Sequence, residues 1–265
     1  MLSELADYYR AQGIAACDFH CRHLADCSRG AGDFVEAREP LVGDQYVAGG
    51  LPRLLFLSLD PATDLCGRAP EQRTVAAVTA WEYEQLHPIS GAPNFMKQSH
   101  WYKTYSMAHA ILASIARSRG KQSPGFSEMH RFFAHTNSAK CKDASRGTAQ
   151  GVARIFRNCS EFIPGELAVL RPDILITQGK RAREAVHGRL PVVRRGVDPS
   201  GQYVAEVVDL AGHHAVKLET HHPNRKDASY YNEARDAWPW YIKVCAVFSE
   251  GGATSLGPAL GFREA

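Results

Sequence analysis

The run Arg53-Leu-Leu-Phe-Leu-Ser-Leu-Asp60, followed by Pro61, decides the fold class of this chain. Its residues are apolar almost without interruption, which is the pattern of a strand buried on both faces, as in a parallel sheet. Pro61 ends the strand, so Asp60 stands at the carboxyl end. Open α/β sheets bind their ligands beyond the carboxyl ends of their strands, and Asp60 is therefore a candidate site residue.

Outward from this strand, apolar runs alternate with helical patterns. Further strands are expected at residues 131–137, 173–177, 203–209 and 214–220, and helices at residues 74–86, 105–116, 152–163, 180–187, 227–237 and 239–248. This alternation predicts an α/β fold, a three-layer α/β/α sandwich with a mainly parallel central sheet. We expect a single domain over residues 1–250, with a cysteine-bearing N-terminal segment. Residues 251–265 are small and weakly patterned, so we expect a mobile C-terminal tail.

The composition is that of an ordinary globular protein. The chain has 265 residues, 45% of them hydrophobic, which suffices for one sizeable core. The formal net charge of +3 does not by itself indicate a nucleic-acid partner. The first residues include acidic ones with no apolar run behind them, unlike a secretory signal, and no apolar run approaches the ~18 residues of a membrane span. We expect a soluble, cytoplasmic monomer, nucleoid-associated in a bacterium, without a membrane partner.

The cysteines form a second feature of the sequence. There are seven, at Cys17, Cys21, Cys27, Cys66, Cys141, Cys159 and Cys245. An odd number in a chain without a secretory signal argues against a disulfide framework. The clustering of Cys17, Cys21 and Cys27 favours metal binding or redox work, and ordinary reduced thiols are the alternative. We expect Cys66 and Cys245 to be free.

Three polar motifs fall at predicted strand ends, namely Asp60-Pro61, Asn137 and His222-Pro223. Taken singly, each has an ordinary explanation: a turn, a loop cap and a surface histidine. In a parallel sheet, however, the carboxyl ends of neighbouring strands meet at one edge. The joint placement of the three motifs therefore predicts one crevice lined by all of them.

The same motifs resemble those of a known enzyme family. The segment Ser58-Leu59-Asp60-Pro61-Ala62 resembles the first motif of the uracil-DNA glycosylase superfamily. Thr136-Asn137-Ser138-Ala139-Lys140-Cys141 is similar to a strand-end segment of its iron–sulfur-containing branch, and His222-Pro223-Asn224 resembles the final His-Pro-Ser motif. The stretch from Cys159 to Gly179 also resembles the branch. The motifs keep the family's order across residues 50–230, and residues 66–100 have no clear counterpart.

The resemblance implies a DNA repair enzyme that flips uracil out of DNA and hydrolyses its N-glycosidic bond, leaving an abasic site. Asp60 would stabilise the cationic sugar and orient water, and His222 would donate a hydrogen bond to the departing base. The Asn137 amide would pair with the edge of uracil and reject cytosine. The other candidates for contacts to the base are Leu59 and, as the stacking ring, Trp101, Tyr102 and Phe95.

The resemblance also implies a 4Fe–4S cluster with a structural role. Cys141 and Cys159 would supply two ligands, and the N-terminal pair is expected to be Cys17 and Cys21, with Cys27 as the substitute for either. Zinc is the competing metal, since four thiolates suit both. The candidates for contacts to the DNA are Asn224, Arg225, Lys226 and Lys140, with Arg225 where the family wedges a loop into the duplex.

The sequence departs from the family in ways that leave the base open. The iron–sulfur branch usually has Ala at the position of Asp60 and an acidic residue at that of Leu59, while the Asp is typical of the main uracil-DNA glycosylases. Asn224 stands where the family has Ser. Hypoxanthine and xanthine are therefore alternative substrates. A catalytically weak DNA-binding protein is a further alternative that Asp60 disfavours. A redox iron–sulfur protein is disfavoured by the lack of tight C-x-x-C runs and of a dinucleotide-binding loop.

Overall fold

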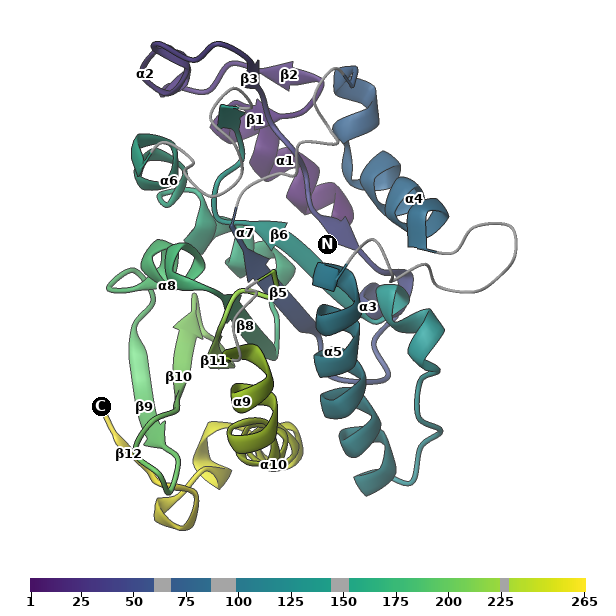
Figure 1. Cartoon of the computed structure of the whole chain (residues 1–265), viewed down its shortest axis with the longest axis vertical. Coiled ribbons are helices and arrows are strands. Elements are labelled where there is room, and N and C mark those ends of the chain that lie inside the picture. Colours follow the sequence, from purple (N-terminus) through teal and green to yellow (C-terminus); the bar gives the residue numbers. More distant parts are fainter. Residues whose placement is uncertain (60–67, 87–98, 144–152, 225–228) are drawn as a thin grey trace.

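The computed structural model describes residues 1–59, 68–86, 99–143, 153–224 and 229–265 (Figure 1). Its main feature is an eight-stranded sheet with the strand order β12-β9-β10-β11-β8-β5-β6-β4. The strands are β4 (Leu41–Val42), β5 (Leu54–Ser58), β6 (Phe133–Asn137), β8 (Ile174–Gln178), β9 (Val192–Val197), β10 (Val204–Leu210), β11 (His213–Thr220) and β12 (Phe262–Glu264). Two short pairs lie outside it, β1 (Ile14–Ala15) with β2 (Asp18–Phe19) and β3 (Phe34–Val35) with β7 (Lys142–Asp143).

Helices surround this sheet. They are α1 (Leu2–Gln12), α2 (Leu24–Ser28), α3 (Asp44–Ala48), α4 (Val75–Leu86), α5 (Ser99–Ser118), α6 (Ala153–Cys159), α7 (Ile163–Leu170), α8 (Lys180–Val186), α9 (Ser229–Asp236) and α10 (Trp238–Gly251), with 3₁₀ turns at Pro70–Arg73, Phe126–Arg131, Ala253–Ser255 and Pro258–Leu260. The single helix expected over residues 152–163 is instead α6 followed by α7. Among the described helices, none combines the length and the apolar character that crossing a membrane requires.

The predicted α/β fold is confirmed, and its sheet is mixed. The neighbours β6, β5, β8 and β11 are parallel, and every residue of β5 is buried, as its continuous apolar run predicts. The outer strands β4, β10, β9 and β12 pair antiparallel with their neighbours. Because two antiparallel steps restore the original direction, β9 runs with the central four, so five of the eight strands share one direction.

Alternate residues of the central strands enter two separate cores, which makes the molecule three layers deep. Leu54 and Phe56 of β5 pack with α5 and α10 on one face. Leu55 and Leu57 pack with α1, α7 and α8 on the other. This alternation is the geometry of a strand, whose successive side chains point to opposite faces. Both faces of the sheet are thus covered, so a ligand can reach the sheet only at its edges.

The expectation of a mobile C-terminal tail is wrong. Residues 262–264 form β12, which extends the sheet by pairing with β9. Leu256, Leu260 and Phe262 belong to the core beneath α10, and the Phe262 ring stacks with Trp240 at 6.3 Å between centroids. Gly196 of β9 leaves the space for this ring, because a Cβ at that position would overlap it. A few separated apolar anchors suffice to hold the tail, and they make no periodic pattern in the sequence.

Candidate functional site

The carboxyl ends of the four parallel strands meet at one edge of the sheet. The pairing register sets Ser58 of β5 beside Asn137 of β6, and Gln178 of β8 beside Thr220 of β11. The chain leaves this edge through Leu59 after β5 and through His221 and His222 after β11. Asp60, the predicted water-orienting carboxylate, lies outside the described residues. Within the described part, two of the three predicted motif positions, Asn137 and His222, thus share this edge with the segment leading into the third.

The segments that follow β5 and β6 are bonded to each other beyond the end of the ladder. The backbone amide of Ser138 donates to the Ser58 carbonyl at 2.9 Å, and that of Ala139 donates to the Leu59 carbonyl at 3.0 Å. The Ser138 hydroxyl also donates to the Leu59 carbonyl, at 2.8 Å. Asn137 is buried at this junction. The Leu59 side chain packs toward the apolar cluster around Cys27, Cys141 and Cys159, which gives it a neighbour other than the predicted base.

His222 is held as a neutral ring with a defined proton position. Its Nδ1 accepts a hydrogen bond from the Asn224 backbone amide at 3.2 Å, so the proton of the neutral ring resides on Nε2. Burial, and after it the nearby positive charge of Lys103, lowers the pKa of His222 to about 4. At neutral pH the ring therefore presents an uncharged N–H donor. Asn224 itself is exposed, and Arg225 and Lys226 lie outside the described residues.

Gly179, directly after β8, makes room for the His222 loop. It has a φ of 93°, which favours glycine, and its amide donates to the Thr220 carbonyl at 2.8 Å. A Cβ at this position would lie 3.0 Å from the His222 Cβ. The two loops following β8 and β11 are thus in direct contact.

A row of polar side chains that the sequence analysis missed, most of them buried, runs beneath the strand ends where the crevice is predicted. His100 and His135 face each other with 3.3 Å between their Nε2 atoms. His135 Nε2 lies 2.9 Å from the Ser58 hydroxyl, which donates to the Gln178 side-chain carbonyl, while the Gln178 amide donates to Thr104 at 3.1 Å. Because the Ser58 proton is committed to Gln178, Ser58 accepts from His135, whose proton therefore sits on Nε2.

His100 connects this row to the predicted catalytic histidine. Its ring centroid lies 5.4 Å from that of His222 and 5.4 Å from that of His135. Burial lowers the pKa of His100 to about 3 and holds that of His135 well below its ordinary 6.5, so both rings are neutral. The sequence offered little signal, because Ser58 is the last residue of its strand and His135 is one of three polar residues in β6.

The structure separates the aromatic candidates. The Trp101 ring is buried next to His135, with 4.8 Å between centroids, and so lies close to the row beneath the crevice. Tyr102 is 51% exposed and packs against Phe126, on another side of α5. Successive residues of a helix point in different directions, so Tyr102 does not share the position of Trp101. The prediction that Tyr102 stacks on the base is therefore not supported, and Phe95 lies outside the described residues.

The prediction that Lys140 contacts DNA is wrong. Only 2% of Lys140 is exposed, and its ammonium lies 2.5 Å from Glu166 and 2.8 Å from the Thr136 hydroxyl. Glu166 is fully buried and also accepts hydrogen bonds from Thr136 and from the Tyr9 hydroxyl of α1. The positive charge of Lys140 is neutralised inside the protein, so its side chain does not reach a DNA phosphate.

Four buried cysteines lie near one another, namely Cys141, Cys159, Cys21 and the expected substitute Cys27. The Cys141 thiol donates a hydrogen bond to Cys159, which raises the pKa of Cys141 and lowers that of Cys159. Burial raises the pKa of Cys21 and of Cys27, and the charge of Cys159 adds to the increase in both. Cys159 also accepts from the Lys140 amide at 3.3 Å.

Cys17 is outside this group. It is exposed, and its electrostatic neighbours are Glu71, Glu39 and Arg73. Cys27, which the sequence analysis gave as the substitute, lies in the buried group, with the Asn158 amide donating to its sulfur at 3.4 Å. Across the described residues, no group of three or more His, Cys, Asp and Glu side chains has the geometry of a formed metal site. Cys66 lies outside the described residues, and Cys245 is buried in the α10 core.

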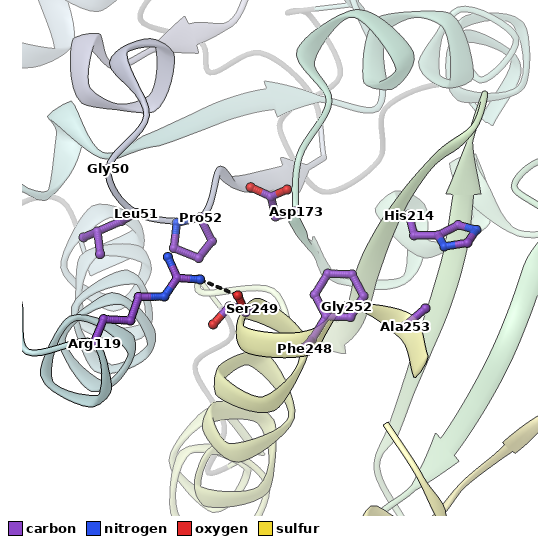
Figure 2. A pocket seen from close by; sticks show the side chains of 10 residues that line it. All are labelled: Gly50, Leu51, Pro52, Arg119, Asp173, His214, Phe248, Ser249, Gly252 and Ala253. Carbon is purple, nitrogen blue, oxygen red and sulfur yellow. Dashed lines mark hydrogen bonds between the residues drawn. The ribbon is translucent and has the colours of Figure 1, made fainter. Parts of the chain in front are cut away.

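A pocket of about 470 Å³ opens at the opposite edge of the sheet, where strands β5, β8 and β11 begin (Figure 2). Its charged side chains have partners in the protein. Arg119 donates to the Ser249 carbonyl, and Asp173 accepts from the Arg53 amide at 2.8 Å and lies 3.4 Å from His213. Neither Asn137 nor His222 lines this pocket.

The chain matches none of the protein-family models and none of the curated proteins with which it was compared. Any functional conclusion therefore depends on the chemistry of its own residues.

Proposed function

We propose that this protein is a DNA glycosylase that hydrolyses the N-glycosidic bond of uracil in DNA and leaves an abasic site. The observation that carries the proposal is the shared sheet edge of Asn137, the neutral ring of His222 and the Ser58-Leu59 segment that leads into Asp60. These groups come from strands distant in sequence. A buried amide and an uncharged N–H donor at one edge suit a site that reads and releases a nucleobase.

The proposed reaction assigns each group a task. The bond between C1′ of the sugar and N1 of uracil breaks, and its electron pair leaves with the base. The Nε2–H of His222 donates to the departing base and stabilises its negative charge. The oxygen of water bonds to C1′ while its proton passes to the Asp60 carboxylate, which also stabilises the cationic sugar. The Asn137 amide donates to one edge atom of uracil and accepts from the next.

We further propose that Cys21, Cys27, Cys141 and Cys159 hold a 4Fe–4S cluster, with zinc as the competing metal. The donor set fits, since four buried thiols come from separate segments and act on one another electrostatically. When bound, the group would supply no step of the hydrolysis. Its ligands would join the N-terminal segment to α6 and to the turn after Asn137.

The activity is tested with an oligonucleotide that carries one uracil, treated with alkali after incubation to cleave at abasic sites. We expect the wild type to release uracil, and Asp60→Asn, His222→Ala and Asn137→Ala each to lower the single-turnover rate by about 100-fold or more. Exposed Lys121→Met, at the opposite edge of the sheet, serves as the control. Release of hypoxanthine or xanthine instead of uracil would support a glycosylase and change the base that we assign to it. Binding of the oligonucleotide without release of any base would refute the enzyme proposal and indicate a DNA-binding protein.

The metal is tested on the purified protein by its visible absorbance and by iron, sulfide and zinc analysis. We expect a brown protein whose colour is lost in Cys27→Ser and retained in Cys17→Ser. A colourless protein containing zinc would exclude the cluster. Retention of the metal in Cys27→Ser with loss in Cys17→Ser would contradict the ligand set.

A further inference from the structure

The loop His221–Asn224 that carries His222 is tied to the protein on both sides. Before His222, the His221 backbone amide donates to Glu233 of α9 at 2.7 Å, and the His221 ring lies 2.5 Å from the same carboxylate. After His222, the ammonium of Lys103 on α5 donates to the Pro223 carbonyl at 2.7 Å. The second tie is unusual because Lys103 is only 9% exposed.

Lys103 is held in place by α9 in return. Its ammonium lies over the Tyr230 ring, 4.3 Å from the centroid, and the Tyr230 hydroxyl donates to the Lys103 carbonyl at 3.3 Å. A buried ammonium is costly unless a carbonyl or a ring replaces its hydration, and both are present here. The head and the backbone of Lys103 are therefore fixed together, and the Pro223 carbonyl is held against a rigid helix.

We infer that Lys103 is a positioning residue for the proposed glycosylase, fixing the Pro223 carbonyl and through it the ring of His222 at the crevice. The inference rests on the proposed function for its effect on the reaction. Glu233 holds the peptide before His222, and Lys103 holds the peptide after it, so the ring between them has little freedom. Lys103 acts through His222 and does not itself contact the base.

Lys103 also acts on the charge state of His222. The groups that face this ring are His100 and Lys103 from α5 and His135 from β6. Burial lowers the pKa of His222 most, and the positive charge of Lys103 lowers it further. Removal of that charge raises the pKa toward its ordinary 6.5. Protonation would place a hydrogen on Nδ1, where it would displace the bond from the Asn224 amide.

The test compares Lys103→Met, which removes the charge at similar length, with Lys103→Arg, which retains it. Lys121→Met is the matched control, because Lys121 also donates to a backbone carbonyl, that of Gly50 at 2.6 Å, but at the opposite edge of the sheet. Three quantities are measured on each full-length protein: the single-turnover rate on the uracil oligonucleotide from pH 4 to 8, the dissociation constant for that oligonucleotide, and the titration of His222 by NMR, assigned with His222→Asn.

We expect Lys103→Met to lower the single-turnover rate by about 10- to 100-fold with little change in the dissociation constant, as for a displaced catalytic group. The NMR midpoint of His222 and the acid limb of the rate profile should both move to higher pH. Lys103→Arg should restore the midpoint, and Lys121→Met should match the wild type.

An unchanged His222 midpoint in Lys103→Met, or an unchanged rate, would overturn the inference. If Lys103→Met fails to fold, Lys103→Gln, which also removes the charge, replaces it, and an unchanged His222 midpoint in that variant overturns the inference. A wild type that releases no base would refute the proposed function, while the NMR titration would still decide whether Lys103 controls His222.

Discussion

His100, His135 and His222 stand close together at the crevice, and each is held in its neutral form. Their hydrogen bonds explain why the positions are polar at all. His135 donates to Ser58, and His222 accepts from the Asn224 amide, so protonation of His222 at Nδ1 would break a hydrogen bond of the native state. The neutral histidines thus determine which ring nitrogens carry a proton at this site, and they make the stability of the fold sensitive to acid.

This arrangement predicts a loss of stability in mild acid. The pKa of each folded-state ring lies below that of the unfolded chain, so between the two values the unfolded state binds more protons, and stability falls as the pH falls. The window opens near the ordinary pKa of 6.5 and extends to about 4 for His222 and about 3 for His100. Urea unfolding between pH 4.5 and 7.5 measures the slope.

The buried His135 provides the matched variant for this measurement. His135→Gln should remove up to about 1.4 kcal/mol per pH unit from the slope, the most that one proton contributes. Exposed His214→Gln should leave the slope as it is. Equal slopes for His135→Gln and the wild type would show that His135 titrates normally in the folded protein.

Lys140 illustrates how a single residue type can mislead. A lysine beside a candidate active site indicates phosphate binding, yet Lys140 lies in a closed network with Glu166, Thr136 and Tyr9. Lys140→Met should cost about 3–5 kcal/mol of unfolding free energy, because it leaves a buried carboxylate without its countercharge. It should leave the affinity for DNA unchanged once the protein is folded.

The exposed pair Lys180–Glu184, 3.7 Å apart, is the control for that prediction. Lys180→Met should cost no more than about 1 kcal/mol in the same denaturant titration, since exposed ion pairs contribute little. A small effect of Lys140→Met on stability combined with weaker DNA binding would restore Lys140 to the list of DNA contacts.

Among the secondary-structure elements, β12 is the one whose role differs most from expectation. Its anchor is Phe262, buried against Trp240 and above Gly196. Phe262→Ala should therefore lower the unfolding free energy by about 3–5 kcal/mol, the usual cost of emptying an aromatic site in a core. The neighbouring exposed Arg263→Ala should change it by less than about 0.5 kcal/mol. Equal effects of the two variants in urea unfolding would mean that β12 is dispensable.

The difference between β5 and β12 shows what sequence pattern can reveal. β5 is buried on both faces, so all five of its consecutive residues are buried. Such a strand can be recognised from its own sequence, without knowledge of the elements that pack against it. β12 has three residues, one of them buried, and depends on β9 and α10 for its place. The strand ends at the crevice were predictable for the same reason as β5. The row beneath it was not, since Ser58, His135 and His100 gain meaning only when the fold joins them.

At the scale of the whole molecule, α6 and β7 hold the N-terminal segment in place. Residues 14–35 form no part of the main sheet and rest on α6 and β7. The Arg154 guanidinium donates to the carbonyls of Cys27 and Arg29 at 3.3 and 2.7 Å, and Asn158 donates to Asp26 at 3.0 Å. Sequence spacing favoured Cys17 and left Cys27 as the substitute, because the position of Cys27 among the buried thiols depends on this contact with α6.

Loss of the Cys27 thiol should therefore loosen residues 14–35 while the two cores stay closed. Hydrogen exchange followed by mass spectrometry measures this directly. In Cys27→Ser, we expect peptides from this segment to exchange at least about 10-fold faster, corresponding to about 1.4 kcal/mol less protection. Peptides from β5 and β8, which are buried between both cores, should exchange as in the wild type. Cys17→Ser is the matched control, because it removes an exposed thiol from the same segment. Faster exchange in Cys17→Ser than in Cys27→Ser would mean that the segment is fastened at its exposed end, and that the four buried cysteines do not act as its anchor.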